Sequence, residues 1–120
     1  MGNKNLLITG SNGCVGQYLI DWFLKNTNYK LILMVRDSNK LPLSVRSNER
    51  ITLLTCDIRD CKKFKQEISE IDYLIHTATA WGDPKRAYEV NVSAFEELLG
   101  LLKKNRIEKI IYFSTASILN

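Results

Sequence analysis

"LLITGSNGCVGQYLI" occupies residues 6–20 and determines how the rest of the chain is interpreted. A short apolar run is followed by glycines at even three-residue spacing, Gly10, Gly13 and Gly16, and an apolar-spaced segment begins at once. Glycine is the residue that permits a tight turn with positive φ and a close approach of backbone. The stretch therefore predicts a buried strand, a tight turn and a helix in direct succession.

The composition indicates one globular domain. The chain has 120 residues, of which 45% are apolar and 25% charged, with a net charge of +4. The basic residues are scattered, without the basic stripe and interleaved aromatics typical of a nucleic-acid interface. No apolar run reaches the ~18–20 residues of a membrane span, and the first residues lack the apolar stretch of a secretory signal. We therefore expect a cytoplasmic protein that binds neither nucleic acid nor membrane.

The cysteines and histidine argue against a metal site. Cys14, Cys56 and Cys61 are odd in number and lack metal-ligand spacing, and the chain has one histidine. We expect three reduced thiols, with Cys56 buried.

Apolar strand-like runs alternate with helix-like segments along the whole chain. This alternation predicts right-handed β-α-β crossovers and a parallel sheet. The expected strands are residues 4–9, 30–36, 51–57, 72–78 and 109–115.

The expected helices are defined by apolar spacing and by capping residues. A helix over 13–26 should place Val15, Leu19 and Phe23 inward, and residues 37–50 read as mostly loop. A short helix should begin at an N-cap Asp60 and a long one should run over 84–104. The inward positions expected on these two helices are Phe64, Ile68, Ala87, Asn91, Ala94, Leu98 and Leu101 or Leu102.

The glycine spacing at the start of the first helix suggests a phosphate-binding turn. A helix N-terminus presents free N–H groups and a partial positive charge, so it favours anions. Gly10 would permit the turn, Gly13 the approach of a pyrophosphate, and Gly16 close packing of helix on strand. No Gly-Lys-Ser/Thr follows, which excludes a P-loop. The stretch predicts dinucleotide binding, with a plain glycine-rich turn as the alternative.

Five stretches resemble one known family. "TGSNGCVG" (9–16) resembles the Thr-Gly-x-x-Gly-x-x-Gly signature of short-chain dehydrogenases/reductases. The others resemble segments of its extended branch, the NAD(P)-dependent nucleotide-sugar epimerase/dehydratase family: "CDIRD" (56–60), "LIHTATA" (74–80), "YEVNVSAFEELL" (88–99) and "IIYFSTASIL" (110–119). The resemblance implies a Rossmann-type doubly wound parallel sheet of about five strands in the order 3-2-1-4-5. Residues 1–120 would be a single NAD(P)-binding domain, the N-terminal part of a longer fold.

The resemblance also implies roles for individual residues. Asp57 and Ile58 would lie at the adenine, and Thr77, Ala78 and Thr79 at the ribose and nicotinamide side. Asn91 would brace the wall of the site, while His76 is expected to be a packed strand-end histidine rather than a base. The cofactor-binding residues expected in the glycine-rich turn are Gly10, Asn12, Gly13, Cys14, Val15 and Gly16.

Thr115 matches the family's catalytic Ser/Thr, whose hydroxyl would donate to the substrate oxygen on the carbon that exchanges hydride. Ser114 is its neighbour and second choice. The family's Tyr-x-x-x-Lys pair does not occur in these 120 residues, and Tyr88 is no substitute because Val92 stands at the lysine position. We expect the N-terminal portion of a longer enzyme or a natural truncation, inactive alone. The alternative is a non-catalytic dinucleotide-binding sensor or scaffold.

The cofactor and substrate are expected from the same resemblance. Arg36 occupies the end of the second strand, where a guanidinium suits a 2′-phosphate, and this favours NADP over NAD. Asp37 beside it could instead bind the ribose. The substrate would be a nucleotide sugar or a related small molecule, with epimerisation, dehydration and reduction all open. A flavodoxin-like or receiver domain is disfavoured, because the first strand is followed by glycines rather than an acidic pair.

The last expected strand would be an open apolar edge. Tyr112 and Phe113 should lie on opposite faces of it. Exposed apolar edges pair with other chains, so we expect a homodimer or aggregate, or a missing C-terminal half that covers this edge.

Overall fold

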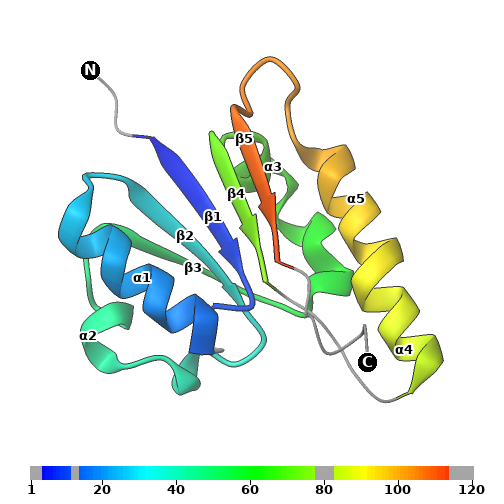
Figure 1. The fold of residues 1–120 in the computed structure, drawn as a ribbon, viewed down its shortest axis with the longest axis horizontal. Coiled ribbons are helices and arrows are strands. Elements are labelled where there is room, and N and C mark those ends of the chain that lie inside the picture. Colours follow the sequence, from blue (N-terminus) through cyan, green and yellow to red (C-terminus); the bar gives the residue numbers. More distant parts are fainter. Residues whose placement is uncertain (1–3, 12–13, 78–82, 114–120) are drawn as a thin grey trace.

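The computed structural model contains one five-stranded sheet in the order β3-β2-β1-β4-β5, with helices on both faces (Figure 1). It describes residues 4–11, 14–77 and 83–113. All four strand pairings are parallel. The predicted Rossmann-type sheet and its strand order are therefore confirmed. The strands are β1 (Asn5–Thr9), β2 (Lys30–Val35), β3 (Ile51–Thr55), β4 (Tyr73–His76) and β5 (Lys109–Tyr112).

The helices form two layers. Figure 1 shows α1 (Cys14–Asn26) and α2 (Leu43–Arg46) on one face of the sheet, with α3 (Lys65–Ser69), α4 (Pro84–Tyr88) and α5 (Ala94–Leu101) on the other. Alternate residues of β1, β2, β3 and β4 pack into two separate cores, one on each face of the sheet. Leu7 and Leu74 pack toward α3 and α5, whereas Leu6 and Ile8 pack toward α1. Both faces are covered, which explains why the strands read as continuous apolar runs.

The segment expected to be one long helix is interrupted. A π-helical turn η3 (Glu89–Ser93) separates α4 from α5, and α5 ends at Leu101 rather than Lys104. The amide of Ala94 donates to the carbonyl of Glu89, which is the i+5 spacing of a π turn. An inserted turn of this kind shifts the helical register, and apolar spacing alone does not predict it.

Two local predictions are corrected by capping geometry. Residues 37–50 hold a 3₁₀ turn η1 (Ser38–Lys40) and the helix α2, so the segment is more ordered than a loop. The helix expected to begin at Asp60 is preceded by a 3₁₀ segment η2 (Ile58–Phe64) whose cap is Asp57. Asp57 takes the role because its carboxylate accepts from the backbone N–H of Arg59.

The inward face of α1 agrees with the expected stripe except at its start. Leu19 and Phe23 are partly buried and pack against the core, whereas Val15 is 45% exposed and Ile20, which was not predicted, is buried. The predicted close packing of Gly16 on the strand end is confirmed by its contact with the turn at Gly10. At the other end of α1 the Arg50 guanidinium donates to several carbonyls, including that of Leu24 at 3.0 Å, and closes the helix C-terminus.

Strand β5 lies at the edge of the sheet. Its apolar residues and the one that follows are 38–42% exposed: Ile110, Ile111, Tyr112 and Phe113. The open apolar edge was expected. Self-association through it stays a prediction.

The two glycines on α1 and α5 make a matched pair for testing the packing of α1. A Cβ on Gly16 would lie 2.7 Å from the carbonyl oxygen of Gly10 and 2.7 Å from Cα of Ser11, whereas a Cβ on Gly100 meets nothing within 4 Å. We expect Gly16→Ala to lower the free energy of unfolding by about 1–3 kcal/mol, as overpacking does. Gly100→Ala should raise it by about 0.5–1 kcal/mol, because alanine favours helix. Urea unfolding measures both, and a neutral Gly16→Ala would contradict the close contact.

Candidate functional site

The predicted site residues follow the carboxyl ends of four neighbouring strands. The register places Thr9 of β1 beside Met34 of β2 and His76 of β4, so these ends lie at one edge of the sheet. The chain order reverses between β1 and β4, and open α/β sheets bind ligands in the crevice at such a reversal. The predicted residues that the structure brings to this edge are Gly10, Arg36, Asp57 and Thr77.

The turn after β1 is held by contacts that require glycine. Gly10 has a φ of 65°, a left-handed conformation that favours glycine. The buried hydroxyl of Ser11 donates to the carbonyl of Ile8 at 2.6 Å, and Gly16 packs directly on this turn. Asn12 and Gly13 lie outside the described residues, and Cys14 is the first residue of α1. The start of α1 is thus fixed against the end of β1.

A hydrogen-bond cluster joins the ends of β1 and β4. The hydroxyl of Thr9 lies 2.8 Å from Nδ1 of His76 and accepts from the backbone N–H of Thr77 at 3.0 Å. The Thr77 hydroxyl donates to the carbonyls of Thr9 and Gly10, at 2.5 and 3.3 Å. Thr77 was predicted to line the ribose side, but its hydroxyl is engaged in hydrogen bonds to the glycine turn. Thr9 was not predicted, although a polar residue ending an apolar strand before glycine is a signal for it.

His76 is a packed histidine, as predicted. It is fully buried, and its ring lies 4.4 Å from Phe95 and 5.5 Å from Tyr112, centroid to centroid. Its Nε2 is buried without a hydrogen-bond partner in the described part of the chain. Burial lowers the pKa of His76 to about 4. The ring is therefore neutral at physiological pH, and a buried neutral ring does not serve as a solvent-accessible base.

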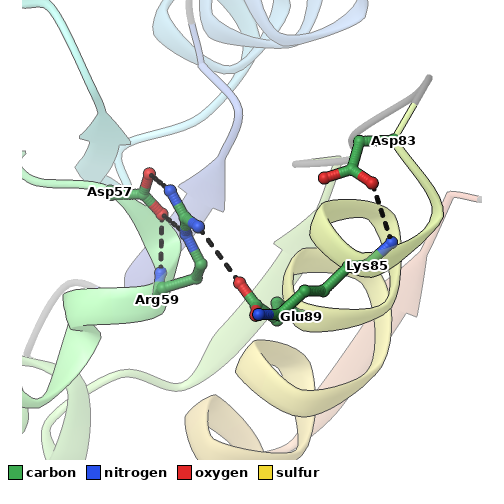
Figure 2. Close-up of polar contacts among 5 residues, drawn as sticks. All are labelled: Asp57, Arg59, Asp83, Lys85 and Glu89. Atoms are coloured by element: carbon green, nitrogen blue, oxygen red, sulfur yellow. Dashed lines mark hydrogen bonds and ion pairs between the residues drawn. The ribbon is translucent and has the colours of Figure 1, made fainter.

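Asp57 is tied to Arg59 and, through it, to Glu89 (Figure 2). Oδ1 of Asp57 accepts from the backbone N of Arg59 at 2.9 Å and from its Nε at 3.1 Å, and Oδ2 accepts from Nη2 at 2.9 Å. Nη1 of Arg59 donates to Oε2 of Glu89 at 3.2 Å. The hydrogen bonds from Arg59 lower the pKa of Asp57 to about 2. Sequence reasoning missed Arg59 and Glu89. The Asp-x-Arg spacing could have indicated the first, but no local pattern marks the second.

Two other predicted residues sit differently from expectation. The side chain of Ile58 is buried in the core, so only its main chain can face a ligand. Asn91 is partly exposed within η3 rather than buried on a regular helix.

The two residues that follow β2, Arg36 and Asp37, make different interactions. Arg36 is exposed and forms no ion pair with any described residue, and its charge contributes to lowering the pKa of Asp57. The carboxylate of Asp37 accepts from the backbone N–H of Asn39 at 3.0 Å and caps η1.

Four predicted site residues lie outside the described residues: Ala78, Thr79, Ser114 and Thr115.

Cys56 and Cys61 are buried free thiols, and burial raises the pKa of Cys61 to about 11. In residues 4–11, 14–77 and 83–113 no cluster of three metal-ligating side chains occurs. No helix within the same ranges is long and apolar enough to cross a membrane.

Comparisons with known proteins show which family this chain matches. The model of the NAD dependent epimerase/dehydratase family matches residues 6–119. A UDP-glucose 4-epimerase of Rickettsia bellii is 29% identical over 94% of this chain and 37% of its own length. A Bacillus cereus UDP-glucuronic acid 4-epimerase in complex with NAD superposes with a TM-score of 0.81 at 24% identity, covering 95% of this chain and 41% of that one.

A yeast methylglyoxal/isovaleraldehyde reductase complexed with NADPH gives a TM-score of 0.77 at 23% identity, covering 92% of this chain and 37% of that one. The chain therefore spans about two fifths of the length of each of these three proteins.

The histidine environment can be tested directly, because the chain has one histidine. We expect its ring resonances to titrate near pH 4 in the folded protein, against about 6.5 for an exposed histidine. The folded-state pKa lies below the unfolded value, so this contribution to stability is complete above pH 6.5 and is lost as the pH falls toward 4. It amounts to about 3 kcal/mol at most. A ring titration by NMR with a midpoint of 6–7 would contradict the burial.

Proposed function

The chain belongs to the NAD dependent epimerase/dehydratase family, and we propose that it binds a nicotinamide dinucleotide at the carboxyl edge of its sheet. It would form the cofactor-binding part of an epimerase/dehydratase-like oxidoreductase. A nicotinamide dinucleotide supplies the hydride acceptor or donor of such a reaction. What this chain supplies is the surface that binds and orients it.

The observation that carries the proposal is the contact between Gly16 and the turn at Gly10. It brings the first turn of α1 against the end of β1, beside the β1–β4 crevice. Free N–H groups at that helix end would meet the pyrophosphate. Val15, exposed in the first turn, and the neighbouring Asn12, Gly13 and Cys14 would complete the cradle.

The adenine side would be formed by Asp57 and the main chain of Ile58. An ionised carboxylate offers about four acceptor positions, and the described residues donate three hydrogen bonds to Asp57. The remaining position suits the amino group of adenine. Thr77, Ala78 and Thr79 would line the ribose and nicotinamide side, with Asn91 on the facing wall.

We propose a nucleotide sugar as the substrate class, supported by the relatives named as UDP-sugar epimerases. Thr115, with Ser114 beside it, would donate a hydrogen bond to the reacting oxygen. These 120 residues contain no Tyr-x-x-x-Lys pair, and a positioned acid/base contributes about 10²–10⁴ in rate. The 120-residue chain would therefore bind dinucleotide without efficient hydride transfer. The alternative is a non-catalytic dinucleotide-binding module.

The residues after β2 support NADP over NAD. Arg36 is exposed without an ion-pair partner in the described residues, so its guanidinium is open to a 2′-phosphate. Asp37, which could bind the ribose hydroxyls of NAD, already caps η1. A carboxylate that caps a helix turn is less available to a ribose.

Calorimetry with NADPH and NADH tests this proposal. We expect NADPH to bind more tightly, and Arg36→Ala to weaken NADPH binding by about 10–100-fold, the worth of a hydrogen bond to a charged group. NADH binding should change by less than about threefold, because NADH has no 2′-phosphate for Arg36 to pair with.

Lys30 provides the matched control, because it lies at the opposite end of β2 and is also exposed. Lys30→Ala should leave both affinities unchanged. Equal binding of NADH and NADPH that ignores Arg36→Ala would remove the NADP preference. Failure of the wild-type chain to bind either dinucleotide would remove the proposed function itself.

A further inference from the structure

The side chain of Arg59 lies between two walls of the candidate site. It holds Asp57 on the loop after β3 through Nε and Nη2, and it reaches Glu89 on η3 through Nη1 (Figure 2). Glu89 is thirty residues further along the chain. The pairing with Asp57 is a two-point fork, which fixes the orientation of a carboxylate as well as its charge.

We propose that Arg59 is a positioning residue that orients the Asp57 carboxylate for the adenine base and fastens it to the π-helical turn. The inference rests on the proposed function, since it assigns a task at the dinucleotide site. Arg59 itself would not touch the dinucleotide. Its donors are already directed at two carboxylates, so it is not the group that would receive a 2′-phosphate.

The π turn η3 holds Glu89, the residue at the far end of this link, in a fixed position. The carbonyl of Glu89 accepts from the amide of Ala94, and the turn packs on the core through buried Val90 and Ala94. Asn91, the predicted wall residue, lies in the same turn. Holding Glu89 therefore sets the distance between the adenine-side loop and the wall that carries Asn91.

The exposure of the three side chains indicates that this link orients the Asp57 carboxylate more than it stabilises the fold. Asp57, Arg59 and Glu89 are 21%, 41% and 38% exposed, and exposed ion pairs contribute little to stability. A second ion pair, Lys62 to Glu97 at 3.9 Å, also joins η2 to the α4–α5 helix layer. Lys62 forms no hydrogen bond or ion pair with Asp57. Its removal therefore loosens the link between these elements without changing the orientation of Asp57.

The orientation of Asp57 has a specific readout. If Oδ2 of Asp57 accepts from the adenine amino group, the hypoxanthine analogue of NADPH should bind more weakly, because an oxygen replaces that donor. A site built to accept a hydrogen bond rejects a ligand that lacks the donor. Loosening Asp57 by removing Arg59 should reduce this preference, and a general loss of structure would not do so selectively.

The experiment measures affinities for NADPH and for reduced nicotinamide hypoxanthine dinucleotide phosphate by calorimetry. We expect the wild-type chain to prefer NADPH by about tenfold or more. Arg59→Ala should weaken NADPH binding by about tenfold and bring the ratio of the two affinities close to one. Lys62→Ala should retain the wild-type ratio, and thermal unfolding should not separate the two variants.

Glu89→Gln and Arg59→Lys keep the proposal testable if Arg59→Ala does not fold. Arg59→Lys keeps the charge without the fork and should lose the preference, whereas Glu89→Gln should reduce it partly. A wild-type ratio in Arg59→Ala, or in Arg59→Lys where only that variant folds, would overturn the role of Arg59 and leave dinucleotide binding standing. A wild-type chain that binds NADPH without preference would overturn the orientation of Asp57. No binding of NADPH at all would overturn the proposed function, and this inference with it.

Discussion

The contact between Gly16 and the turn at Gly10 and Ser11 is the constraint on which the rest of the structure depends. An added Cβ at Gly16 would lie within 3 Å of three backbone atoms of that turn, so helix and strand approach as closely as two backbones can. This closeness fixes the start of α1 against the carboxyl end of β1, the strand that pairs with β4. The left-handed φ of Gly10 makes the reversal possible.

The polar groups around that turn hydrogen-bond mainly to the turn and to the strand ends beside it. The backbone N–H of Thr77 donates to the Thr9 hydroxyl, and the hydroxyls of Ser11 and Thr77 donate to carbonyls of β1 and of the turn. His76 completes the cluster as a neutral buried ring. The charged groups lie further out, where Arg59 holds Asp57 and Arg36 stays exposed. At the carboxyl edge of the sheet, hydrogen-bonded uncharged groups thus lie beside the glycine turn, and the charged groups lie on the loops after β2 and β3.

Local apolar runs and one topological rule predicted the strands and their parallel pairing, and the resemblance to a known family predicted the strand order. Prediction from the sequence failed where the decisive contact is made by distant residues or by backbone alone. The apolar spacing placed the exposed Val15 inward on α1 and missed the buried Ile20, and the π turn at Glu89 left no mark in that spacing. Asp57 replaced Asp60 as the cap because hydrogen-bond geometry decides between two aspartates that a sequence pattern cannot separate. Arg59 and Glu89 are joined across thirty residues, which no local pattern reveals.

The proposed dinucleotide site at the carboxyl edge of this sheet can be located by titrating the ¹⁵N-labelled chain with NADPH and following its amides by two-dimensional NMR. We expect the largest amide shifts at Gly10, Ser11, Asp57 and Thr77. Amides at the opposite ends of the strands, such as those of Lys30 and Tyr73, should stay unchanged. Shifts concentrated at those opposite ends, or no shifts at saturating NADPH, would show that this edge does not bind the dinucleotide.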